Sequence, residues 1–121
     1  MSKTILVVDD SSSLRQVVNI TLTGAGYTVI EANDGRDALG KCNGQKIHLV
    51  ISDVNMPNMD GITFVQELKK NPAYKFTPVI MLTTESGEDK KSAGQAAGAK
   101  AWVTKPFQPA QMLAAVSKLI V

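Results

Sequence analysis

The sequence has 121 residues but only one cysteine and one histidine, and aromatic residues make up just 5% of it. A single cysteine cannot form an internal disulfide, so Cys42 is expected to be a packing residue in a reducing compartment. No stretch approaches the roughly 20 apolar residues that a membrane-spanning helix needs, and the N-terminus lacks a signal-peptide pattern. These absences predict a cytoplasmic protein with no membrane association.

The sequence also lacks a strong excess of charge and several common ligand motifs. Thirteen basic and eleven acidic residues give a net charge of +2, which does not predict a nucleic-acid partner. No glycine-rich phosphate loop follows the first apolar run, which disfavours a dinucleotide site or a Walker loop. The segment 53–64 matches a calcium-binding loop only in part, because Pro57, Asn58 and Phe64 occupy positions reserved for other residue types. His48 is expected to have a structural role.

What the sequence does contain is a regular alternation of two patterns. Five short apolar runs lie at 4–8, 28–31, 48–52, 78–82 and 101–103. The helices predicted around them have apolar faces at Leu14, Val17, Val18 and Leu22, at Ala38, Leu39 and Cys42, at Ile62, Val65 and Leu68, at Ala93, Ala96 and Ala97, and at Met112, Leu113, Val116 and Leu119. The alternation predicts an α/β fold with a parallel sheet covered by helices on both faces.

Polar residues follow most of the predicted strands at the point where each strand ends. Asp9 and Asp10 follow the first strand, Asp53 follows the third, Thr83 follows the fourth and Lys105 lies near the fifth. Ligands bind at the carboxyl ends of such strands, where the winding of the sheet reverses. If strands one, three, four and five are neighbours, these side chains meet in one shallow pocket.

This group of residues fits a specific chemistry. Three clustered carboxylates repel one another unless a cation joins them, and oxygen donors without nearby histidine or cysteine favour Mg²⁺. Lys105 and Thr83 provide an ammonium and a hydroxyl that can contact the oxygens of a transferring phosphoryl group. Asp53 is then the candidate nucleophile. Each residue alone has an ordinary structural explanation, such as helix capping next to Ser11, so the prediction depends on their joint occurrence.

The same residues carry a resemblance to a known family. The motifs are Val7-Val8-Asp9-Asp10-Ser11, Ser52-Asp53-Val54-Asn55-Met56-Pro57 with Asp60-Gly61, Met81-Leu82-Thr83-Thr84, and Val103-Thr104-Lys105-Pro106-Phe107. In this order and spacing they resemble the receiver domains of response regulators, most closely the single-domain, CheY-like chemotaxis regulators. The resemblance extends from Ile5 to about Ile120. It implies a flavodoxin-like, doubly wound five-stranded sheet in the order 2-1-3-4-5 with five helices, as a single receiver domain over residues 1–121.

The resemblance also implies roles for the acidic residues. Asp53 matches the residue that accepts a phosphoryl group from the phosphohistidine of a histidine kinase. Asp10, Asp53 and the main-chain carbonyl of Asn55 match the Mg²⁺ ligands, with Asp9 binding directly or through water. Asn55 and Glu85 match positions that tune dephosphorylation, and they lead us to expect a short-lived phosphoryl state.

Other residues match the parts of the family that transmit the signal. Thr83 matches the switch hydroxyl, Lys105 the lysine that pairs with the phosphoryl group, and Pro106 a proline that often follows a cis peptide bond. Trp102 stands where the family usually has tyrosine or phenylalanine. Two alternatives remain open for its indole: it moves inward on activation, or it stays outward as a fixed contact residue.

The predicted function is that of a phosphorylation-activated response regulator of a two-component system. Because the sequence ends soon after the last predicted helix, no output domain is expected, and a monomer would act by binding a partner. The leading expectation is chemotaxis, with a chemotaxis-type histidine kinase as phosphodonor, the flagellar motor switch protein as target and a phosphatase as a further partner. The alternative is a phosphate sink or relay in another pathway. No enzymatic activity is expected beyond self-catalysed phosphoryl transfer and autodephosphorylation.

Two other protein classes remain as rivals. A Mg²⁺-dependent phosphatase with an aspartyl-phosphate intermediate would normally have an Asp-x-Asp pattern after its first strand, whereas this chain has Asp9-Asp10. A flavin electron carrier would have a phosphate loop rich in serine, threonine and glycine at that position. A colourless preparation would exclude the flavin carrier.

Overall fold

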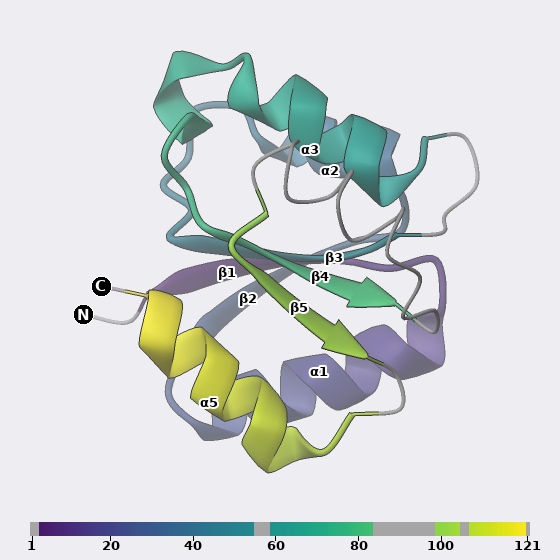
Figure 1. Ribbon diagram of the computed structural model, residues 1–121, viewed down its shortest axis with the longest axis vertical. Helices are drawn as coiled ribbons and strands as arrows, with labels where there is room; N and C mark the ends of the chain where they lie inside the picture. Colours follow the sequence, from purple (N-terminus) through teal and green to yellow (C-terminus); the bar gives the residue numbers. More distant parts are fainter. Residues whose placement is uncertain (1–2, 55–58, 84–98, 105–106, 121) are drawn as a thin grey trace.

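Among the described residues, a parallel sheet of five strands forms the middle layer of the protein (Figure 1). In this computed structural model, residues 3–54, 59–83, 99–104 and 107–120 are described. The strands are β1 (Thr4–Val8), β2 (Thr28–Ala32), β3 (Leu49–Asp53), β4 (Val79–Thr83) and β5 (Ala101–Thr104). They lie in the order β2-β1-β3-β4-β5, and every neighbouring pair is parallel. The predicted strand order and α/β class are therefore confirmed.

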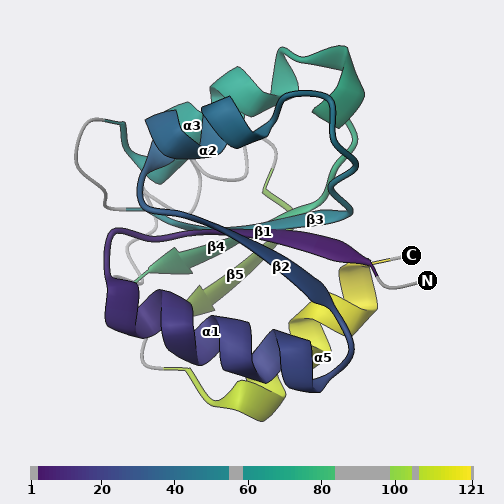
Figure 2. The ribbon, with the colours of Figure 1, turned by 180° about the vertical axis from the view of Figure 1, so that it is seen from behind.

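Helices cover both faces of this sheet (Figures 1 and 2). The helices are α1 (Ser12–Gly24), α2 (Gly35–Lys41), α3 (Gly61–Lys69) and α5 (Pro109–Leu119), with a short 3₁₀ helix η1 (Pro72–Tyr74). α1 and α5 lie on one face, and α2 and α3 lie on the other. The helix predicted between residues 87 and 98 lies outside the described residues. Within the described ranges, no helix has the length and apolar character that crossing a membrane requires.

The central strand β1 is apolar at successive positions because it is covered on both sides. Ile5 and Val7 belong to the core under α1 and α5, while Leu6 and Val8 belong to the core under α2 and α3. All four side chains are fully buried. Complete burial of such a side chain contributes about 1.5–3 kcal/mol, so the two cores together hold the strand in a fixed position.

Helix α1 begins and ends at residues whose chemistry suits those positions. The Ser11 hydroxyl caps its N-terminus by accepting a hydrogen bond from the Leu14 N–H at 3.3 Å. At the C-terminus Gly26 has a φ of 96°, a left-handed conformation that glycine adopts readily. The Tyr27 N–H then donates to the Leu22 carbonyl at 3.1 Å, which closes the helix in a Schellman motif.

The apolar face of α1 is narrower than the sequence pattern predicts. Val18 and Leu22 are fully buried, but Val17 is 48% exposed. Residues four apart stack on one stripe of a helix, whereas Val17 lies about 100° away from Val18 around the axis. The prediction that Val17 belongs to the buried face is therefore wrong.

The only cysteine lies at the end of α2. The Cys42 thiol is free, and the residue is only 8% exposed within the core under α2 and α3. Burial raises the pKa of this thiol to about 11. The side chain therefore stays a neutral thiol, in agreement with the packing role expected from the sequence.

The only histidine joins β1 to β3 at the end of the sheet where the strands begin. The Thr4 N–H donates to His48 Nδ1 at 3.0 Å, and the His48 N–H donates to the Thr4 carbonyl at 2.8 Å. β3 itself begins at Leu49, one residue later than predicted. Burial lowers the pKa of His48, and the charges of Lys3 and Lys46 lower it further.

This lowered pKa predicts a pH-dependent stability. The unfolded chain binds a proton at His48 near pH 6.5, where the folded protein still resists protonation, so the free energy of unfolding falls as the pH drops through this range. Urea unfolding between about pH 7.5 and 5.5 should show a steeper loss for the wild type than for His48→Gln. Equal slopes for the two proteins would contradict the assignment.

Candidate functional site

Three carboxylates gather at the carboxyl ends of β1 and β3. Asp9 and Asp10 follow β1 directly, and Asp53 is the last residue of β3. The two strands are parallel neighbours with Val8 opposite Ser52, so their ends coincide. Carboxylate oxygens of Asp9, Asp10 and Asp53 lie within 4.8 Å of one another. We call these three residues the acid cluster.

The acid cluster combines burial with strong mutual repulsion. Asp9 is 1% exposed and Asp53 is 6% exposed, while Asp10 faces solvent. Two unit charges 4.8 Å apart repel by about 3 kcal/mol at an effective dielectric constant of about 20. A hard divalent cation with oxygen ligands would remove this repulsion, and three carboxylates at this spacing fit Mg²⁺ with water molecules completing the shell. The structure thus brings together the three carboxylates among the residues predicted to meet in one pocket.

The backbone around Asp9 is fixed from several sides. Its N–H donates to the Ala32 carbonyl of β2 at 3.1 Å, which extends the sheet by one residue beyond β1. One of its side-chain oxygens accepts a hydrogen bond from the Ser11 N–H at 2.9 Å. Its carbonyl accepts a further hydrogen bond from Nη1 of Arg15 in α1. Asp10 follows immediately, so these bonds also limit where its carboxylate can lie.

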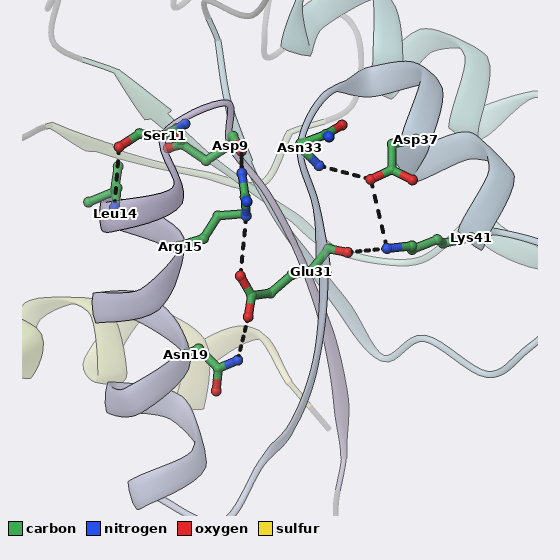
Figure 3. A network of polar contacts seen from close by, with 9 residues as sticks. All are labelled: Asp9, Ser11, Leu14, Arg15, Asn19, Glu31, Asn33, Asp37 and Lys41. Carbon is green, nitrogen blue, oxygen red and sulfur yellow. Dashed lines mark hydrogen bonds and ion pairs between the residues drawn. The ribbon is translucent and has the colours of Figure 1, made fainter.

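Arg15 is itself held by a polar network between α1 and β2 (Figure 3). Its Nε lies 3.2 Å from Oε1 of Glu31, and the two side chains are 17% and 38% exposed. The Asn19 amide donates to the other Glu31 oxygen at 2.7 Å. Glu31 therefore orients the guanidinium that contacts the Asp9 carbonyl, and Asn19 orients Glu31.

The network continues from β2 into α2 (Figure 3). The Lys41 ammonium donates to the Glu31 carbonyl and lies 3.7 Å from an Asp37 oxygen. The same Asp37 oxygen accepts a hydrogen bond from the Asn33 N–H at 3.0 Å. No sequence pattern predicted this network. Its signal was Glu31, the one charged residue in β2.

The end of β3 is shaped by close contact with the start of α3. The Val54 N–H donates to the Leu82 carbonyl at 3.0 Å, and the Gly61 N–H donates to the Val54 carbonyl at 2.8 Å. A Cβ atom on Gly61 would lie only 2.0 Å from the Asp53 carbonyl oxygen. Asp60 caps α3 by accepting a hydrogen bond from the Thr63 N–H at 2.7 Å. Gly61 thus allows the backbone of Asp53 to pack directly on α3.

Trp102 lies on β5 opposite Met81 of β4. It is half-buried and packs against the core under α2 and α3. Its indole Nε1 is buried, and it has no hydrogen-bond acceptor among the residues that the structure describes. Such a buried donor costs about 1–3 kcal/mol. In this conformation the indole is thus partly covered by the core, but its N–H donates no hydrogen bond to a described residue.

The remaining predicted site residues are only partly within the described ranges. The backbone of Thr83 ends β4 opposite Thr104, one residue beyond the pair formed by Asp53 and Leu82. Thr83 therefore lies at the same edge of the sheet as the acid cluster. Asn55, Glu85, Lys105 and Pro106, and with them the cis-bond prediction, lie outside the described residues.

Comparison with known proteins identifies the family to which the chain belongs. A family model described as the response regulator receiver domain matches residues 5–117. The chain belongs to this family. It is thus a receiver domain of the kind found in two-component response regulators, as the motifs predicted.

Several similar proteins support the assignment. The chemotaxis protein CheY4 of Vibrio cholerae is 46% identical, with a TM-score of 0.96 over 99% of this chain and 100% of that chain. Protein PilG of Pseudomonas aeruginosa is 37% identical over 93% of this chain and 83% of PilG. The alkaline phosphatase synthesis transcriptional regulatory protein PhoP of Bacillus subtilis is 38% identical over 99% of this chain. The chain spans about half of PhoP, namely 49% of its length.

The contact between Gly61 and Asp53 gives a prediction for this receiver domain. Gly61→Ala should reduce the free energy of unfolding by about 2 kcal/mol or more, because the new Cβ atom overlaps the Asp53 carbonyl and forces the backbone apart. Gly40→Ala in α2 is the matched control. A Cβ there has no neighbour within 4 Å, so the helix should gain about 0.5–1 kcal/mol. Urea unfolding measures both, and equal effects would refute the steric explanation.

Proposed function

We propose that Asp53 is the residue of this receiver domain that accepts a phosphoryl group. A carboxylate oxygen of Asp53 attacks the phosphorus of a histidine kinase phosphohistidine, the P–N bond breaks as the new P–O bond forms, and the electron pair returns to the histidine ring. The observation that carries the proposal is the acid cluster, which has carboxylate oxygens within 4.8 Å at the end of β3. The product is an acyl phosphate on a strand that both cores hold rigidly.

We further propose that the acid cluster binds Mg²⁺. Asp9, Asp10 and Asp53 would hold the ion, together with the Asn55 carbonyl that the family resemblance implies. The bound ion would neutralise the carboxylates and the oxygens of the phosphoryl group. Thr83 is proposed as the switch hydroxyl and Lys105 as the ammonium that pairs with the phosphoryl group. Glu85 and Asn55 are proposed to shorten the lifetime of the phosphorylated state.

The proposed output is the binding of a partner protein in chemotaxis. The similarity to CheY4, a chemotaxis protein, favours this pathway. A hollow of about 580 Å³ between β5 and α5 offers a binding surface, lined by Lys100, Ala101, Ala114, Ala115, Lys118 and Leu119. The flagellar motor switch protein is the proposed target, with a phosphate sink or relay as the alternative. In either case the protein acts as a cytoplasmic monomer, with no enzymatic activity beyond its own phosphorylation and dephosphorylation.

The assignment of Asp53 can be tested with a small phosphodonor. With acetyl phosphate and Mg²⁺, intact-protein mass spectrometry should detect one added phosphoryl group on the wild type and none on Asp53→Asn. Chelation of Mg²⁺ should slow the labelling strongly, because the transferring charge then lacks its counter-ion. Trp102 fluorescence provides an independent signal of the same event, since it is the only tryptophan.

The matched control is Asp60→Asn. Asp60 lies near the site but outside the acid cluster, and an asparagine can still cap α3. This variant should label like the wild type. Labelling of Asp53→Asn at wild-type levels would disprove the assignment, and labelling that ignores chelation would disprove the role of Mg²⁺.

The polar network predicts that Arg15 positions the acid cluster. Arg15→Gln should weaken Mg²⁺ binding about 10-fold, because the Asp9 carbonyl loses its guanidinium contact and residues behind metal ligands commonly have effects of this size. The measurement is a Mg²⁺ titration followed by Trp102 fluorescence without phosphodonor.

Arg36→Gln provides the control for charge. Arg36 is exposed on α2, and its replacement removes the same positive charge as the Arg15 change. Its Mg²⁺ affinity should stay within about twofold of the wild type, since exposed charges are screened by solvent and salt. Equal losses in the two variants would mean that Arg15 acts through its charge alone and not by positioning Asp9.

A further inference from the structure

A second charged region lies at the opposite end of the sheet from the acid cluster. Lys69 is the last residue of α3, Lys75 and Phe76 follow η1, and Lys100 directly precedes β5. These four residues line a cleft of about 300 Å³. We call it the basic cleft. It lies beside the amino ends of β4 and β5, whereas the acid cluster lies at the carboxyl ends of β1 and β3.

Among the described residues, the lysines of the basic cleft have no acidic partners. The ion pairs among the described residues involve Arg15, Lys41 and Lys70, and none involves a lysine of the cleft. Lys69 donates a hydrogen bond to the Thr77 carbonyl instead. Burial, followed by the charge of Lys100, lowers the pKa of Lys69. The cleft therefore concentrates positive charge that a bound anionic group would stabilise.

Phe76 gives the cleft an apolar component. Its side chain is 88% exposed, more than any other large hydrophobic residue described. The Lys75 ammonium lies 5.7 Å from the centre of the ring, which leaves much of the ring open. Single exposed apolar residues are common on protein surfaces. Here, however, the ring lies at the rim of a cleft whose other lining residues are all lysines.

The surrounding backbone is well fixed, so the cleft does not depend on a loose loop. Tyr74 is 2% exposed, and its hydroxyl donates to the Gln45 carbonyl at 2.7 Å while it accepts from the Gly44 N–H at 3.0 Å. The Lys100 N–H donates to the Val79 carbonyl at 2.8 Å. Both rims of the cleft are thus attached to the core. Little conformational entropy of the protein is therefore lost when a ligand binds.

We propose that the basic cleft binds an acidic segment of a partner protein, with an apolar side chain of that segment against Phe76. Charge complementarity favours an acidic ligand, and the open ring favours a polypeptide over a purely ionic one. A net charge of only +2 does not favour nucleic acid. The cleft shares Lys100 with the hollow between β5 and α5. It lies at the opposite end of the sheet from the acid cluster, however, so this binding does not require a phosphoryl group on Asp53.

Fluorescence anisotropy of the full chain tests the proposal with two labelled peptides. One peptide has six acidic residues around a central Leu-Phe pair, and the other has a Gly-Ser pair in its place. We expect the first to bind more tightly, and its affinity to fall as salt rises from about 50 to 300 mM. Lys75→Glu and Lys100→Glu should each weaken binding about fivefold or more. Phe76→Ala should remove the preference for the Leu-Phe peptide.

Two controls separate this site from others. Lys70→Glu changes a neighbouring lysine that already pairs with Glu67 at 2.7 Å, and it should leave the affinity within about twofold. Amide chemical shifts of the ¹⁵N-labelled protein should change around residues 69, 75, 76 and 100 on peptide binding. All the changed side chains are at least partly exposed, and thermal unfolding verifies that each variant is folded.

Several results would overturn the proposal. They are the absence of peptide binding at millimolar concentration, shift changes centred elsewhere, and equal losses for Lys70→Glu and Lys75→Glu. Tighter binding of a ten-nucleotide oligothymidylate, lost in the same variants, would assign the cleft to nucleic acid instead. Binding is measured without Mg²⁺ or phosphodonor, so its failure is distinct from a failure of Asp53 phosphorylation. Binding that occurs only with saturating acetyl phosphate would show instead that a phosphoryl group on Asp53 is required.

Discussion

Parallel hydrogen bonding between β1 and β3 is the constraint on which the rest of the structure depends. Both strands are buried on both faces, so their positions are set by the two cores and not by the polar residues that follow them. Since the strands end side by side, the carboxylates of the acid cluster lie together despite repelling one another. Packing energy from the cores thus holds three carboxylates close together, in an arrangement that suits a divalent cation.

Most of the fold and the centre of the site followed from the sequence, because both depend on local patterns. Alternating apolar runs fixed the strands, and the aspartates adjoining β1 and β3 were recognisable from their positions after those runs. The contacts of Arg15 with Asp9 and Glu31 were not recognisable from the sequence. They join a side chain of α1 to groups at the end of β1 and on β2, and only the folded chain brings these together. Val17 was wrongly assigned to the buried face for a related reason. Helical periodicity shows which side of a helix faces the core, but how wide the buried stripe is depends on the neighbouring elements.

Gly61 illustrates the same limit at the level of backbone geometry. The Asp60-Gly61 pair was recognisable as part of a motif, but the reason for the glycine is the approach of the Asp53 carbonyl, which no local pattern contains. Trp102 is similar, since its burial depends on how β5 packs beside β4. The charged groups at the two ends of the sheet also come from distant segments. In each case the missing information concerns a distance between residues far apart in the chain.

The buried thiol of Cys42 has a practical consequence for this molecule. A neutral thiol buried at the end of α2 is shielded from alkylating and oxidising reagents as long as this region stays folded. Because it is the only sulfhydryl in the sequence, any modification reports the opening of this one region without interference from another site. The rate at which a thiol reagent modifies Cys42 therefore measures how often this region opens, with no engineered label required.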